Sequence, residues 1–169
     1  KLMSTVKDKN VFNIAIEGNF DDCQNLVKSM FSDKEFSTSI NMSGVNSINW
    51  ARIIAQSVYY FYTYFLLNNN RPINFSVPTG NFGDVYAGYL SKKMGLPIGK
   101  LIVATNQNDI LHRAISKGKY EAAKVCETIS PSMDIQIASN FERLLYDLNN
   151  FDSEETKKVM EKIKKDGKY

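Results

Sequence analysis

Two stretches of the sequence share the tripeptide Gly-Asn-Phe, which can form a tight turn. One lies in IAIEGNFDD at residues 14–22 and the other in SVPTGNFGD at residues 76–84. Each tripeptide follows a run rich in β-branched residues and precedes a stretch with helical periodicity. A strand that ends in a glycine-rich turn and enters a helix presents unpaired N–H groups and a partial positive charge. Such a turn can bind a phosphate group.

The second turn has the composition of a phosphate site. Glycines bracket its Asn-Phe pair, so backbone without Cβ atoms could curl around an anion. Its acid falls in the first helical turn, where a carboxylate can cap the helix. We predict that five residues bind the phosphate of a small molecule or cofactor: Gly80, Asn81, Phe82, Gly83 and Asp84. A single G-x-x-G turn is also typical of an ordinary strand-to-helix connection.

The first turn lacks these properties. It has one glycine, and Glu17, Asp21 and Asp22 surround it with carboxylates that would repel a phosphate. We interpret it as a capped strand-to-helix turn. Neither turn is followed by the residues of a G-x-G-x-x-G dinucleotide site or of a P-loop, which excludes both classes.

Short β-branched runs alternate with helical patterns along the chain. The patterns predict strands at 13–18, 73–79, 100–105 and 133–138, and helices at 20–31, 49–67, 84–95, 108–118, 140–149 and 153–167. This order predicts an α/β fold, a parallel sheet of βαβ units with helices on both faces. We expect one domain over residues 1–169, with a polar lead at 1–10 and a charged terminal helix at 153–169.

Composition excludes several classes of function. The net charge is +3, and much of the excess lies in residues 157–168, which argues against a nucleic-acid partner. The most apolar stretch, 53–67, contains polar residues and is shorter than the roughly 20 residues of a membrane span. We therefore interpret it as a buried helix. No cysteine or histidine spacing suggests a metal site, and two distant cysteines fit a reducing, cytoplasmic setting.

Four blocks of the sequence resemble the threonine synthase family. They are EGNFDDCQNLVK, NSINWARIIAQSVYY, SVPTGNFGDVYAGYLSKKMGLPIGKLIVATNQNDIL and TISPSMDIQIASNFERLLY, in order between about residues 11 and 148. The resemblance implies a lyase of the tryptophan-synthase-β-like fold that uses pyridoxal 5'-phosphate. It also implies threonine biosynthesis, in which O-phosphohomoserine and water give threonine and phosphate.

The family's glycine-rich loop binds the cofactor phosphate and maps onto residues 80–84. The family often has Asn where this chain has Asp84, so we expect that side chain to point away from the phosphate. The family's Schiff-base lysine lies N-terminal to the first strand predicted here, and nothing before residue 11 resembles its segment. The resemblance thus implies a central part of the cofactor-binding domain, with no catalytic residue, that is inactive alone.

The turn before the long helix supplies candidates for binding the substrate, O-phosphohomoserine. They are Asn46, Ser47, Asn49 and Arg52. The first three also suit helix capping, whereas Arg52 could pair with a phosphate or carboxylate. Two other functions stay open: a non-catalytic module for a phosphorylated ligand, and a related pyridoxal-phosphate enzyme acting on serine or cysteine derivatives. The sequence makes no prediction of the oligomeric state.

Overall fold

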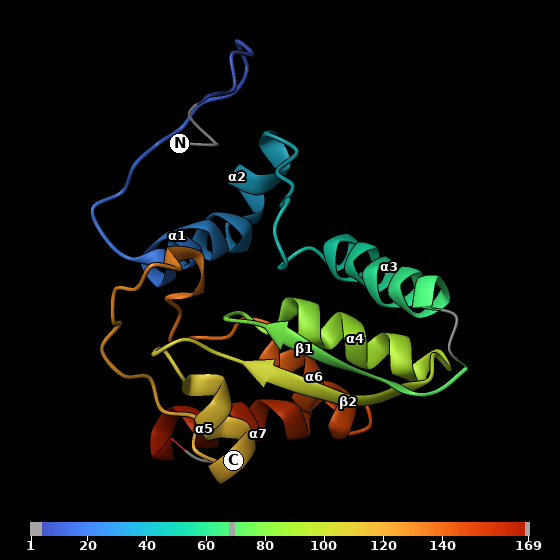
Figure 1. Ribbon diagram of the computed structural model, residues 1–169. Coiled ribbons are helices and arrows are strands. Elements are labelled where there is room, and N and C mark those ends of the chain that lie inside the picture. The colour runs from blue at the N-terminus through green and yellow to red at the C-terminus, as the bar shows by residue number, and fades with distance from the viewer. Residues whose placement is uncertain (1–4, 68–69, 168–169) are drawn as a thin grey trace. The chain divides into compact units, whose positions relative to one another are not determined.

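The computed structural model describes residues 5–67 and 70–167 (Figure 1). Residues 1–4 of the predicted polar lead and residues 168–169 of the terminal segment lie outside this description. The chain divides into two compact units, residues 1–42 and 43–169. Each unit is described by itself.

The first unit contains helices α1 (Phe20–Ser32) and α2 (Lys34–Ser39). The prediction of α1 is confirmed, whereas α2 was not predicted. Asp33 separates the two helices, and its side chain accepts a hydrogen bond from the Phe36 N–H at 3.0 Å. The predicted strand at 13–18 is wrong, because this segment is irregular and exposed. A strand needs a neighbouring strand to pair with, and the sheet found among the described residues does not include this segment.

The second unit is built on the βαβ motif of β1 (Ile73–Pro78), α4 (Gly83–Lys93) and β2 (Ile98–Ala104). The two strands pair in parallel, with Phe75 opposite Leu101 and Val77 opposite Val103. The predicted α/β class and the central βαβ unit are therefore confirmed. The loop that joins β1 to α4 lies at the carboxyl end of β1, where parallel sheets commonly bind ligands.

Helices α3 (Trp50–Leu67) and α4 run side by side on one face of the sheet (Figure 1). Tyr60 of α3 packs edge-on against Phe75 of β1, with ring centroids 4.9 Å apart. The three elements approach closely at Gly88, where an added Cβ would lie 2.6 Å from Tyr60 and 2.9 Å from Leu101. Gly88 thus sets the spacing of this core.

The remaining helices are α5 (Ile110–Lys117), α6 (Phe141–Leu148) and α7 (Ser153–Asp166). All three agree with the predicted helices to within two residues at each end. In Figure 1, α5 and α7 lie below the strands. The buried core of the unit includes Ile53, Val77, Val85, Ile110, Leu111, Phe141 and Leu145.

The predicted strand at 133–138 is wrong. It is instead an irregular segment that follows a short 3-10 turn at Pro131–Met133. The Asp134 carboxylate accepts hydrogen bonds from the side chains of Asn106, Asn108 and Thr128 at 2.7, 3.0 and 2.7 Å. The Thr128 hydroxyl is the main cause that lowers the pKa of Asp134. Side-chain bonds therefore hold this segment in place of a strand ladder.

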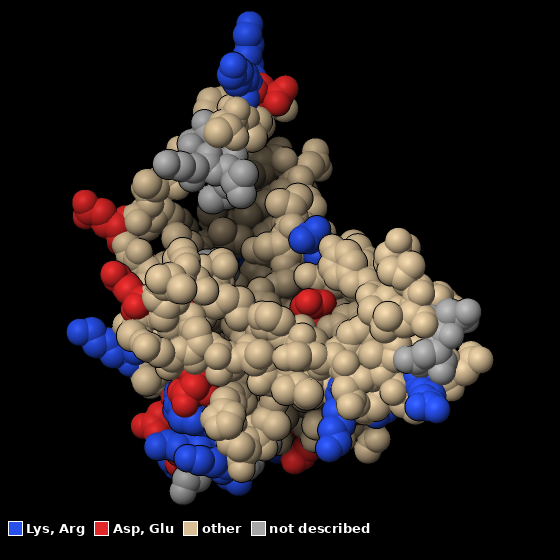
Figure 2. Space-filling model, viewed as in Figure 1, with Lys and Arg blue, Asp and Glu red and all other residues tan. Residues whose placement is uncertain are grey.

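The outer surface of α3 is apolar, although the sequence predicted a buried helix. Only Ile53, Ser57 and Tyr60 of this helix are buried. Its exposed large side chains are Trp50, Ile54, Val58, Tyr59, Tyr62, Phe65, Leu66 and Leu67. Figure 2 shows a largely uncharged surface over this helix and mixed charges at the lower edge of the view. No helix within the described ranges has the length and hydropathy of a membrane span.

Candidate functional site

The loop between β1 and α4 contains a residue with an unusual backbone conformation, Phe82. This residue lies just before α4 with φ of 66°, in the left-handed region that residues with a Cβ rarely adopt. Neither Gly80 nor Gly83 has a positive φ. The two glycines therefore do not serve to supply left-handed backbone angles. They are needed for space.

The glycine at 83 is required because other segments contact it closely. A Cβ at this position would lie 3.0 Å from the Cβ of Ser47, 3.2 Å from Oδ1 of Asn81 and 3.4 Å from Nδ2 of Asn140. A Cβ on Gly80 would lie 2.8 Å from the end of the Ile135 side chain. The loop is thus in close contact with two other parts of the chain, near residue 47 and at residues 135–140.

Two loop side chains hydrogen-bond N–H groups of the loop itself. Thr79 Oγ1 accepts from the Phe82 N–H at 3.1 Å, and Asn81 Oδ1 accepts from the Gly83 N–H at 3.0 Å. The next N–H groups, those of Asp84 and Val85, belong to the first turn of α4, where a helix has no internal acceptor for them. The N–H groups of Asp84 and Val85, rather than those of Phe82 and Gly83, are therefore the ones that neither the loop side chains nor the helix pairs at the start of α4.

The four predicted substrate residues at 46–52 have different environments in the structure. Ser47 approaches the loop, and its Oγ accepts a hydrogen bond from Asn81 Nδ2 at 2.7 Å. The side-chain oxygens of Asn46 and Asn49 accept from the N–H groups of Ile48 and Ala51, which is the capping role. Arg52 is exposed on the first turn of α3.

The side chain of Asp84 lies on the α3 side of the loop. It lines a cavity of about 130 Å³ with Tyr60 and Val77, and its Oδ1 is buried without a hydrogen-bond partner among the described residues. Burial raises the pKa of the Asp84 carboxyl. The Tyr60 hydroxyl donates to the main-chain oxygen of Asp84 at 2.8 Å.

Replacing Asp84 by asparagine is expected to raise the melting temperature at pH 7 by a few degrees. A carboxyl whose pKa is higher in the folded state costs stability when ionised, and the cost grows as pH rises from about 4 toward the folded pKa. The gain from Asp84→Asn should therefore shrink as the pH is lowered to about 4. Thermal unfolding of both chains from pH 3 to pH 8 measures it. If the difference in melting temperature between the two chains stays constant from pH 3 to pH 8, the buried Asp84 carboxylate is not the cause of that difference.

The first Gly-Asn-Phe turn has a different arrangement. Oδ1 of Asn19 accepts from the N–H groups of Asp21 and Asp22 at 2.8 and 3.1 Å, and Oδ2 of Asp22 accepts from the Asn19 N–H at 2.8 Å. This is the reciprocal capping box of α1. The predicted cap is confirmed, and its side chains already pair the N–H groups that a ligand would need.

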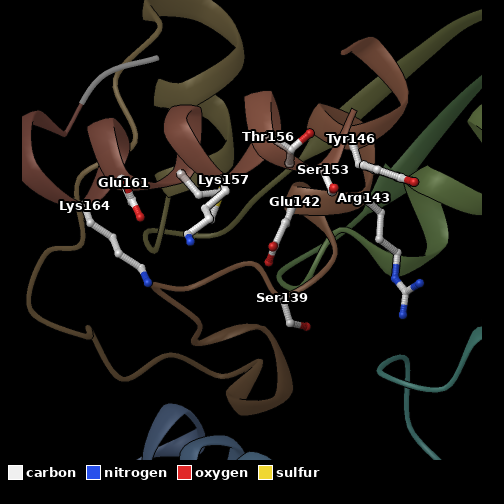
Figure 3. A pocket seen from close by; sticks show the side chains of 10 residues that line it. Ser139, Glu142, Arg143, Tyr146, Ser153, Thr156, Lys157, Glu161 and Lys164 are labelled. Carbon is white, nitrogen blue, oxygen red and sulfur yellow. The ribbon is translucent and has the colours of Figure 1, made fainter. Parts of the chain in front are cut away.

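A second cavity, of about 510 Å³, lies between α6 and α7 (Figure 3). Its charged lining residues carry both signs: Glu142, Arg143, Lys157, Glu161 and Lys164. Groups of the two signs neutralise each other, so the cavity has no clear preference for an anion.

The comparisons with known proteins agree in one assignment. Threonine synthase of Pseudomonas aeruginosa is 52% identical over 167 residues, which are 98% of this chain and 36% of the relative. That of Saccharomyces cerevisiae is 56% identical over 148 residues, 85% of this chain and 29% of the relative. The structure of pyridoxal-phosphate-bound threonine synthase from Brucella melitensis matches with a TM-score of 0.82 at 55% identity, covering 96% of this chain and 35% of that one.

The chain belongs to the threonine synthase family. It spans about a third of the length of the relatives it matches. No protein-family model matches it. The fold expected of that family is confirmed for this segment by the structural match.

The loop of this threonine synthase segment can accommodate the phosphate of pyridoxal 5'-phosphate, the family's cofactor. A phosphate needs several donors and no facing carboxylate. The start of α4 offers the N–H groups of Asp84 and Val85, while the carboxylate of Asp84 lines the cavity beside Tyr60. The residues present therefore fit the group.

The sequence analysis missed Asn140, which contacts the loop, and Arg143, which contacts Asn140. Asn140 is buried, and both its N–H and its side-chain amide donate to the main-chain oxygen of Asn81 at 3.0 and 3.2 Å. Arg143 donates to Oδ1 of Asn140 at 2.9 Å. The only signal at Asn140 was an Asn at the start of a predicted helix, a position where Asn usually caps the helix. The Asn140 side chain makes no such cap bond.

Proposed function

We propose that this chain is the segment of a threonine synthase that binds the phosphate of pyridoxal 5'-phosphate through residues 80–84. The whole enzyme would convert O-phosphohomoserine and water to threonine and phosphate, in the cytoplasm, where both free cysteines stay reduced. The observation that carries the proposal is the start of α4, whose first-turn N–H groups at Asp84 and Val85 have no helix acceptor, in a segment 55% identical to a pyridoxal-phosphate-bound relative.

The roles of the chain's own residues follow from their positions. The N–H groups of Asp84 and Val85 would bind phosphate oxygens at the positive end of the α4 dipole. Thr79 and Asn81 would keep the loop curled by bonding the N–H groups of Phe82 and Gly83. The bound cofactor supplies an electron sink for carbanion chemistry on the substrate. Ser47 and Arg52 lie on the turn that we propose contacts the substrate.

Mixing the 169-residue chain with pyridoxal 5'-phosphate and borohydride is expected to label surface lysines only in part, with no single site modified completely. The reason is that no lysine of this chain stands in a segment resembling the family's Schiff-base segment. The chain alone should likewise form no threonine from O-phosphohomoserine. Peptide mapping and a threonine assay measure the two results. One fully modified lysine, or threonine formation, would contradict the assignment of the chain as a phosphate-binding segment without its own catalytic lysine.

A further inference from the structure

We propose that Asn140 and Arg143 are positioning residues that hold the phosphate-binding loop in its competent conformation. The inference rests on the proposed function of that loop. It starts from a chain of hydrogen bonds that connects three segments far apart in sequence: residues 46–50, 79–83 and 140–143.

The start of α6 restrains the left-handed residue of the loop. Asn140, with 1% of its surface exposed, directs two donors at the main-chain oxygen of Asn81, the residue just before Phe82. The next residue, Phe141, packs its ring edge-on against Phe82 at 5.5 Å. A left-handed backbone at a bulky residue persists only where its surroundings enforce it. Asn140 and Phe141 provide that restraint.

Arg143 fixes Asn140 in turn. Its Nε donates to Oδ1 of Asn140 at 2.9 Å, and another nitrogen of the same guanidinium donates to the main-chain oxygen of Ile48 at 2.7 Å. The guanidinium also lies over the Trp50 ring, 5.4 Å from its centroid. Figure 3 shows the Arg143 side chain directed away from Lys157 and Lys164 of α7, toward the segment before α3.

The connections form a closed circuit. Ile48 neighbours Ser47, whose Oγ accepts from Asn81 in the loop, and Asn81 accepts from Asn140. The Arg143 guanidinium therefore connects Asn140 to Ile48 and closes the ring of hydrogen-bonded residues around Gly83. Only a planar fork with several fixed donors can reach the two acceptors together, so a lysine should not replace it.

The role of Arg143 differs from that of a direct phosphate ligand. A direct ligand would act through its positive charge, which lysine retains. A positioning arginine acts through its two simultaneous hydrogen bonds, which lysine loses. Comparing Arg143→Lys with Arg143→Met separates these roles.

The test is titration of the full chain with pyridoxal 5'-phosphate and, separately, with inorganic phosphate. The amide chemical shifts of residues 80–85 report binding in both titrations. Both Arg143→Lys and Arg143→Met are expected to weaken binding about tenfold. The matched control is Arg113→Lys, because Arg113 also joins a side chain, Asp109, to a main-chain oxygen, that of Glu121. It should bind like the parent chain.

A ligand-free measurement keeps the inference testable if the parent chain does not bind. Hydrogen exchange of the Phe82 and Gly83 amides should accelerate in Arg143→Lys and in Asn140→Ala, while amides of α5 stay unchanged.

The outcomes distinguish the two proposals. No binding by the parent chain at residues 80–85 would overturn the proposed function, and exchange would then decide the positioning role. Binding by Arg143→Lys that equals the parent's would overturn the positioning role alone, as would unchanged exchange at Phe82 and Gly83.

Discussion

Replacing Gly83 by valine is expected to weaken phosphate binding by the chain at least about tenfold. The new side chain would collide with Ser47, whose Cβ lies 3.0 Å from the position of the added Cβ, and would press against Oδ1 of Asn81. The hydrogen bond from the Gly83 N–H to Oδ1 of Asn81 would then be lost, and the first turn of α4 would shift. Calorimetric titration with phosphate or pyridoxal 5'-phosphate measures the loss.

The matched control is Gly18→Val at the first Gly-Asn-Phe turn. A Cβ there would lie 2.8 Å from Oδ2 of Asp22, so this variant should disturb the cap of α1 and leave phosphate affinity unchanged. Asn81→Ala should have a smaller effect, about 1 kcal/mol in binding free energy, because it removes side-chain hydrogen bonds without forcing the Ser47 segment away from the loop. Parent-like binding by Gly83→Val, or ligand-induced shifts centred on residues 18–22, would show that the phosphate site is assigned to the wrong loop.

Replacing Gly88 by valine is expected to destabilise the second unit by about 3 kcal/mol. Tyr60 of α3 and Leu101 of β2 lie 2.6 and 2.9 Å from the position of the added Cβ, so two elements would have to move apart. The Tyr60 hydroxyl would also lose its bond to the main-chain oxygen of Asp84. Urea unfolding followed by circular dichroism measures the change in the free energy of unfolding.

Gly95→Ala separates this packing effect from the general effect of adding a Cβ to a glycine. Gly95 follows α4 with φ of 99° and has open space around its Cβ position. Alanine there should cost only the backbone strain, about 1 kcal/mol. Equal losses from the two substitutions would mean that α3 and β2 do not press on Gly88 in solution.

The sequence predicted the parts of the fold that depend on local signals. Helices such as α1 and α7 have periodic apolar residues with acidic first turns, and both were located closely. The glycine loop between β1 and α4 could be located because two glycines follow a strand and precede a helix. The contrast with the first turn was also predictable, since three nearby acids indicate a cap.

The rest depends on contacts that no local pattern contains. Segments 13–18 and 133–138 have β-branched residues, but no strand pairs with them among the described residues. The residues that restrain the loop lie far along the chain: Asn140 is 59 residues from Asn81, and Arg143 is 95 residues from Ile48. An Asn before a helix usually caps that helix, so the sequence around Asn140 gave no indication that its side chain bonds the loop instead.

These separations imply an order of events during folding. The β1–α4–β2 motif closes over a short stretch of chain, so its loss of chain entropy is small and it is expected to form early. The bonds from Asn140 and Arg143 join residues 59 and 95 positions apart, and they can form only after α6 docks. The glycine loop is therefore expected to form early in folding and to become rigid only after α6 docks. If the proposed function is correct, a nascent chain would bind phosphate only after that docking is complete.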